Sequence, residues 1–274
     1  MFRSTLICGL VTLLCACGGG SGADLGPIVT QIQASSLRYG GIAAIYVAGQ
    51  YMRSDMVADT GTCTNPSFSS SSTPGQVLLN CKVTAVGALP ITLKSADGTV
   101  LFSQTITVLP PQVTLVTSKG SIVLELNPQV VPATVDNFLK YVNAGYYKST
   151  LFHRVIAGFV VQGGGYTTGL VKKAGQGAPI ALESNKGLLN ARGSLAMART
   201  SVSDSATSEF YVNLVDNPSL DYQSAANPGY AVFGKVVQGM DVVDAIAAVP
   251  TATFNATADV PTSDVAITLA LQTQ

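Results

Sequence analysis

The 274-residue chain has no tryptophan, a single histidine and few charged side chains, and these shortages exclude several functions. Charged residues make up 11% of the chain and the formal net charge is zero, so there is no basic stripe to bind a nucleic acid. The one histidine, His153, stands outside any HExxH run, which argues against zinc-dependent hydrolysis. Gly163–Gly165 are not followed by Gly-Lys-Ser/Thr, as a phosphate loop would require. No nucleic acid, metal or cofactor is therefore expected.

The chain also has no long apolar run near its start. Leu6–Leu14 follows Arg3 and is too short to span a bilayer, so residues 1–16 are expected to be a targeting signal. The sequence that ends in Cys17 resembles a bacterial lipoprotein signal, with Cys17 as the lipidated residue and residues 17–25 as a Gly/Ser tether. An ordinary secretory signal that is cleaved nearby is the alternative. In such lipoproteins an aspartate directly after the lipidated cysteine retains the protein in the inner membrane. Gly18 stands at that position here. The resemblance therefore implies an outer-membrane anchor, on the periplasmic side, if the source is Gram-negative.

Two cysteines remain beyond this signal, Cys63 and Cys81. An exported protein would hold them in an oxidising compartment, where a disulfide is expected. Closing the loop between them would stabilise the fold by about 3 kcal/mol on the chain-entropy model. A reactive or metal-binding pair is less favoured, because the spacing is not CxxC and no histidine is near.

Residues 26–108 are expected to form an immunoglobulin-like β-sandwich. Short β-prone runs alternate there with Gly-, Pro- and Asp-containing turns, including a Ser-rich loop over residues 68–75, and no helical period is visible. The expected strands cover residues 42–47, 77–82, 91–93 and 101–108. Residues 109–112 contain Pro110-Pro111, which favours an extended linker.

Residues 113–272 are expected to form a second domain, a closed β-barrel. A hairpin is predicted over residues 113–126, and a helix begins at Pro132, shows an apolar i, i+3, i+4, i+7 face and ends at Gly145. A second helix is predicted over residues 240–248 and a last strand over residues 265–271. Many antiparallel strands with only two helices suggest closure, which removes exposed sheet edges.

The run Phe152–Gly165 places Arg154 and Gln162 within an apolar, β-prone stretch. A charge in such a stretch is costly unless it has partners or a task, so the run indicates a site. It resembles the signature strand of the cyclophilins, the peptidyl-prolyl cis-trans isomerases that cyclosporin inhibits. Further similar blocks cover residues 193–200, 205–213 and 229–243. The resemblance implies an eight-stranded barrel capped by two helices, and rotation of X–Pro bonds in proline-containing clients.

By the same resemblance, Arg154 is the main catalytic residue. Phe159, Val160, Tyr211, Leu220 and Phe233 would form the wall of the proline pocket. Gln162 would bond the peptide backbone and orient the arginine. The adjoining groove would be lined by Ala198, Arg199 and Thr200, with Arg199 offering mainly its backbone as in an added strand. His153 is interpreted as a structural residue rather than a base, because bond rotation moves no proton.

Four positions depart from the usual family pattern. Glu209 replaces a glutamine and would place a negative charge near Arg154, either steadying the arginine or competing for it. Tyr211 replaces a phenylalanine and adds a hydroxyl that needs a partner. Tyr230 replaces the histidine of animal cyclophilins at the pocket rim. Ser219 replaces their tryptophan, which puts cyclosporin binding in doubt but leaves the reaction intact.

The sequence as a whole predicts an exported, lipid-anchored peptidyl-prolyl isomerase that acts on unfolded or extended envelope proteins, with an N-terminal β-sandwich as spacer. Two alternatives stay open. The barrel could bind proline peptides with little turnover, as a chaperone module. The sandwich could itself be an adhesion or docking domain.

Overall fold

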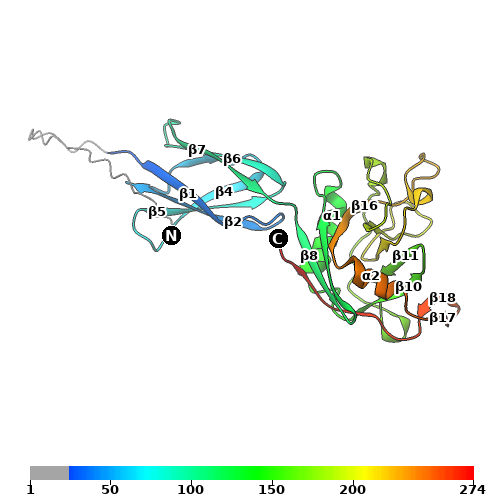
Figure 1. Ribbon diagram of the computed structural model, residues 1–274. Coiled ribbons are helices and arrows are strands. Elements are labelled where there is room, and N and C mark those ends of the chain that lie inside the picture. Colours follow the sequence, from blue (N-terminus) through cyan, green and yellow to red (C-terminus); the bar gives the residue numbers. More distant parts are fainter. Residues whose placement is uncertain (1–24) are drawn as a thin grey trace, which may run out of the picture.

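A computed structural model describes residues 25–274 and shows two β regions that follow one another along the chain (Figure 1). The first contains seven strands in two sheets, and the second is a closed eight-stranded barrel with two helices. The mainly β fold expected from the sequence is confirmed. The expected signal over residues 1–16 and its lipidation site Cys17 lie outside the described residues. Within residues 25–274, no helix is both long enough and apolar enough to span a bilayer.

The N-terminal region is a two-sheet sandwich. One sheet has the strand order β1-β2-β5-β4 and the other β3-β6-β7, which is the arrangement of a constant-type immunoglobulin domain. Alternating side chains of each strand point inward, as Val77, Leu79 and Cys81 do in β5, and they share one apolar core. The strands are β1 (Ile28–Ser36), β2 (Ile42–Gln50), β3 (Val57–Asp59), β4 (Cys63–Ser70), β5 (Gln76–Val83), β6 (Gly87–Lys94) and β7 (Val100–Val108).

The expected disulfide joins Cys63 at the start of β4 to Cys81 in β5. The two Cα atoms are 5.3 Å apart, within the usual range for a disulfide. The loop expected between the cysteines is shorter than the sequence suggests, because Phe68 to Ser70 belong to β4 and pair with β5. A Ser-rich stretch can form this strand because β4 lies at the sheet edge, with one neighbour and with side chains largely in water.

The barrel closes in the order β10-β11-β15-β14-β16-β9-β8-β19, and β19 pairs back with β10. Its strands are β8 (Gln112–Thr117), β9 (Gly120–Leu126), β10 (Thr150–Ile156), β11 (Val160–Gly163), β14 (Ser194–Met197), β15 (Phe210–Asn213), β16 (Val232–Gln238) and β19 (Ala266–Gln272). Two small hairpins lie beside it, β12 (Tyr166–Thr167) with β13 (Val171–Lys172), and β17 (Thr251–Phe254) with β18 (Thr257–Pro261). Three short 3-10 turns complete the region: η1 (Thr168–Leu170), η2 (Ser184–Lys186) and η3 (Pro218–Leu220).

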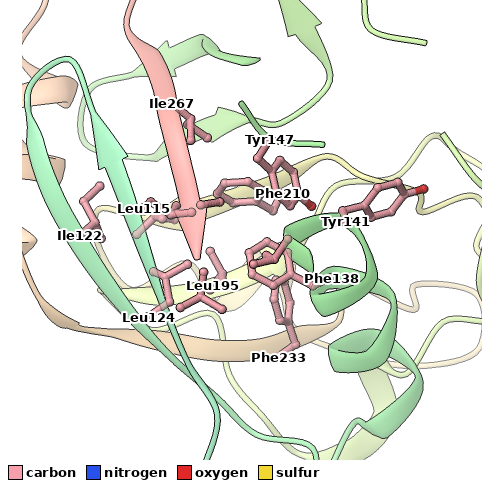
Figure 2. Packing of buried hydrophobic residues seen from close by; sticks show 14 of the residues in the cluster. Leu115, Ile122, Leu124, Phe138, Tyr141, Tyr147, Leu195, Phe210, Phe233 and Ile267 are labelled. Carbon is pink, nitrogen blue, oxygen red and sulfur yellow. The ribbon is translucent and has the colours of Figure 1, made fainter. Parts of the chain in front are cut away.

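Both expected helices are present, α1 (Pro132–Asn143) and α2 (Met240–Ala247). Pro132 occupies the first turn of α1, and Gly145 just beyond its end has a φ of 66°, a conformation that glycine adopts at little cost. The apolar face of α1 packs into the barrel core, where Phe138 lies 5.5 Å from Phe210 and 5.1 Å from Phe233 between ring centroids (Figure 2). The helices therefore complete the apolar filling of the barrel.

The sandwich and the barrel meet through a few specific contacts. Tyr39, in the turn before β2, is buried within the apolar cluster of the barrel. Its hydroxyl donates to Asp136 on α1 at 2.9 Å, and its backbone oxygen accepts from Gln272 at 3.1 Å. Gln129 also donates to the backbone oxygen of Val86 at 3.3 Å. These contacts join the sandwich to the α1 side of the barrel.

Candidate active-site groove

Strand pairing alone brings the central site residues into one row. The turn after β10 passes through Gly158, whose φ is 70°, and β11 then returns along β10. In this register Arg154 lies opposite Gln162, Gln162 opposite Tyr211, and Tyr211 opposite Ala196. Residues that are up to 57 positions apart thus form a line across four neighbouring strands.

The row borders a groove of about 140 Å³ on the barrel surface. Arg154, Gln162 and Arg199 line it together with aromatic and aliphatic side chains. It adjoins a small buried cluster that includes Val160 and Val232. A groove that combines apolar and aromatic side chains with a guanidinium suits a proline ring whose nitrogen gains electron density. The lining residues are Arg154, Phe159, Val160, Gln162, Ala198, Arg199, Tyr211, Leu220 and Tyr230.

Arg154 has an acidic neighbour that the sequence did not reveal. Its Nε atom lies 3.9 Å from a carboxylate oxygen of Asp259, and both side chains are 39% exposed. Asp259 belongs to β18, in the hairpin packed beside β10. No local pattern links two residues 105 positions apart, so sequence reasoning had no signal for this pair.

Glu209 lies near the row, but it does not line the groove. Its Oε2 atom accepts a hydrogen bond from Nε2 of Gln162 at 3.0 Å and lies 3.3 Å from Nε2 of His153. The side chains that contact its carboxylate are therefore Gln162 and His153, whereas Arg154 is paired with Asp259. The contacts of Glu209 correct the expectation that it acts directly on the arginine.

The hydroxyl of Tyr211 has a protein partner. It donates to Oδ1 of Asn190 at 2.8 Å, and Asn190 is in turn held by Asp221. Burial raises the pKa of Tyr211 well above its ordinary value, so the phenol stays neutral. Its ring meets that of Tyr230 edge to face at 5.7 Å, which gives the groove two adjoining aromatic walls.

The side chain of Arg199 folds back onto the groove rim. Its Nε donates to the backbone oxygen of Gly229 at 2.9 Å, and its guanidinium lies 4.7 Å from the ring centre of Tyr230. These contacts steady Tyr230 and occupy the charged head of Arg199. Thr200 lies just outside the groove lining, where its hydroxyl bonds that of Ser205 at 2.9 Å.

Phe233 occupies a different place from the one expected. Its side chain is fully buried in the barrel core against Phe138, and it does not reach the groove (Figure 2). Its neighbour Val232 belongs instead to the cluster beneath the groove. Adjacent strand residues point to opposite faces, so only one of the two can serve the site. The proposed wall is therefore made without Phe233.

His153 is nearly enclosed, at 6% exposure. Its ring lies 4.6 Å from that of Tyr166 on β12, and its Nδ1 atom is buried with no hydrogen-bond partner among the described residues. Within residues 25–274, no group of three or more His, Cys, Asp or Glu side chains is placed to hold a metal ion.

The barrel, its two helices and this groove define a cyclophilin-type isomerase fold. The model of the cyclophilin type peptidyl-prolyl cis-trans isomerase family matches residues 112–270, and the chain belongs to that family. The activity of the chain is accordingly peptidyl-prolyl cis-trans isomerisation, with proline-containing peptides as substrates.

Bacterial relatives match 57% of the chain. Peptidyl-prolyl cis-trans isomerase A of Dickeya dadantii (strain 3937) is 48% identical over 155 residues, which are 57% of this chain and 80% of the relative. Peptidyl-prolyl cis-trans isomerase B of Escherichia coli (strain K12) is 48% identical over 157 residues, 57% of this chain and 95% of the relative. A crystal structure of a Cryptosporidium parvum cyclophilin type isomerase, in the presence of the dipeptide Ala-Pro, has a TM-score of 0.51 and 27% identity. It covers 60% of this chain and 99% of that chain.

Proposed function

We propose that Arg154 accelerates X–Pro rotation by stabilising the twisted amide. Amide resonance creates a barrier of about 18–20 kcal/mol, and it is lost when the bond is rotated halfway. The prolyl nitrogen then becomes pyramidal and regains a lone pair, which a guanidinium can bind through its fixed N–H donors. The planar ground state offers no such lone pair, so the interaction favours the transition state selectively.

The observation that carries this proposal is the placement of Arg154 in one groove with aromatic and aliphatic side chains. Phe159, Val160, Leu220 and the rings of Tyr211 and Tyr230 would hold the proline ring. Gln162, opposite Arg154 in the strand register, would bond the peptide backbone. Ala198, Arg199 and Thr200 would border the rest of the extended peptide. No nucleophile or proton shuttle is needed, because no covalent bond is broken.

We further propose that the clients are unfolded or extended proteins of a bacterial envelope. The lipoprotein-like sequence around Cys17 supports export and a lipid anchor. Palmitate labelling tests the anchor, and the label should be absent from Cys17→Ser. The Cys63–Cys81 disulfide supports an oxidising compartment. The sandwich would then be a spacer that holds the groove away from the outer membrane. The alternative is that the sandwich docks a partner protein, and a pull-down with the sandwich as bait tests it.

The test is a proline-isomerisation assay with an unstructured peptide and the full chain. Peptide affinity is measured separately, by titration. Catalysed exchange together with binding supports the proposal. Binding without catalysed exchange would instead make the groove a proline-peptide-binding module.

A further inference from the structure

Glu209 has two nitrogen neighbours at one oxygen atom, Nε2 of Gln162 at 3.0 Å and Nε2 of His153 at 3.3 Å. Oε2 accepts from Gln162 on β11 and faces Nε2 of His153 on β10. The side chain lies over Gly165, where a Cβ atom would come within 2.5 Å of Cγ of Glu209. A side chain at position 165 would therefore displace the carboxylate, and glycine there leaves it room.

An ionised carboxylate can only accept hydrogen bonds, and this property fixes the neighbouring amide. The NH₂ group of Gln162 must turn toward Glu209, since its carbonyl oxygen would be repelled. The acceptor Oε1 and the second N–H of that amide are then the groups left for the groove that Gln162 lines. A glutamine at position 209 would not fix the orientation of the Gln162 amide, because its own amide can either donate or accept a hydrogen bond.

We infer that Glu209 is a positioning residue, which orients Gln162 so that its carbonyl oxygen accepts a backbone N–H of the bound peptide. The inference rests on the proposed function, since it assigns a direction to the peptide contact of Gln162. It also gives His153 a task as the second donor that holds the carboxylate in place. Glu209 itself touches neither the peptide nor Arg154.

The surroundings of Glu209 keep the carboxylate charged. Burial works against ionisation, but hydrogen bonds from His153 and Gln162 and the charge of Lys172 on β13 together hold the pKa of Glu209 below its ordinary value. Tyr166 on β12 is the other titratable neighbour, and burial and the charge of Glu209 raise its pKa. The acceptor-only form is thus the one present at neutral pH.

The first arm of the test follows the amide of Gln162 directly. Nitrogen-15 NMR of the full chain, with the Gln162 side-chain signal assigned by substitution, compares wild type with Glu209→Gln. Glu125→Gln is the matched control, since Glu125 lies on β9, where its carboxylate pairs with Lys235 of the neighbouring strand β16. The Gln162 NH₂ signals should move in Glu209→Gln and stay in place in Glu125→Gln. Unmoved signals in Glu209→Gln would overturn the inference.

The second arm measures binding of a proline peptide and of analogues methylated at one backbone nitrogen each. In wild type, methylation of the nitrogen that donates to Gln162 should weaken binding by about two- to tenfold, as expected for one hydrogen bond. In Glu209→Gln this penalty should shrink, with a rise in KM and little change in kcat. An equal penalty in both proteins would contradict the proposal.

His153→Asn provides a second variant if Glu209→Gln fails to fold. Removing the ring donor should loosen Glu209 and move the same Gln162 signals, by a smaller amount. Unchanged signals in this variant would count against the inference. The NMR signals and the binding affinities are measured without turnover, and only KM and kcat need it. The two arms therefore stay informative even if the full chain binds proline peptides and does not isomerise them.

Discussion

The sandwich and the barrel are both built from antiparallel strands around an apolar core, yet they differ in how many polar side chains they bury. In the sandwich Thr60 is a buried polar side chain, and most of the other buried side chains described there are apolar. The barrel buries many polar side chains, including His153, Asn190 and Asn213, and connects them into networks close to the groove. Buried polar groups are costly unless they are paired, so their concentration in one region marks where positions must be held accurately. The sandwich is held instead by its apolar core and a disulfide.

The largest expected difference between the regions concerns arginine. Arg154→Ala should lower kcat/KM for a proline peptide by about 10²–10³-fold, the usual loss on removing one preorganised donor. Arg154→Lys should recover little, because an ammonium cannot reproduce the planar set of donors. Arg38→Ala, in the exposed part of the sandwich, is the matched control and should keep wild-type activity. A similar loss of kcat/KM in both alanine variants would show that activity does not depend on the barrel groove alone.

Removing the disulfide should lower stability and leave activity unchanged, the reverse of what is expected for Arg154. Replacing both Cys63 and Cys81 with serine should lower the free energy of unfolding of the sandwich by about 3 kcal/mol. Turnover should be unchanged, since the disulfide lies in the sandwich, apart from the groove. Urea unfolding followed alongside an isomerase assay measures both quantities. Loss of turnover in a protein whose barrel stays folded would show that the sandwich contributes to catalysis.

Acid is expected to have a smaller effect, on the stability that the Glu209 carboxylate contributes. The pKa of Glu209 is lower in the folded protein than its ordinary value of 4.5, so its charge stabilises the fold above that ordinary value. The contribution is lost as the pH falls through the lowered pKa. Unfolding curves of wild type and Glu209→Gln, taken from neutral pH to about pH 3, should therefore converge toward the acid end. A stability difference that is independent of pH would contradict the assignment.

The smallest predicted change is at Asp259. Its ion pair with Arg154 is 39% exposed on both sides, and such pairs contribute about 0–1 kcal/mol. Asp259→Asn should therefore lower kcat by about two- to threefold, by leaving the guanidinium less well positioned. Asp264→Asn is a nearby control that removes a carboxylate bonded to Thr168 instead. A rise in kcat would mean that Asp259 competes with the substrate for Arg154.

The sequence predicted those features that depend on local patterns. Pro132, the apolar period and Gly145 defined α1 almost to the residue, and the run around Arg154 and Gln162 led to the barrel and its groove. Features that depend on tertiary pairing were missed. The first strand of the sandwich and the Ser-rich part of β4 became strands because neighbouring strands supply their hydrogen bonds.

Residue roles were harder to predict than residue positions. Phe233 belongs to a motif shared with the family, but a motif does not say which of two adjacent side chains faces the core. Here Phe233 faces the barrel core, and Val232 belongs to the buried cluster with Val160 and Tyr211. Asp259 reaches Arg154 from a hairpin far along the chain. Glu209 was placed correctly near the site, but its partners, His153 and Gln162, follow from side-chain directions that spacing does not reveal.

The most direct test of the central claim separates rotation of the proline bond from binding of the peptide. Exchange NMR on an X–Pro peptide at saturating concentration gives the cis–trans rate on the full chain, and titration of the same sample gives the affinity. Arg154→Ala is expected to lose about 10²–10³-fold in the bound exchange rate and much less in affinity, since Phe159 and Tyr211 still hold the proline ring. A folded Arg154→Ala protein that exchanges its bound peptide at the wild-type rate would contradict the central claim.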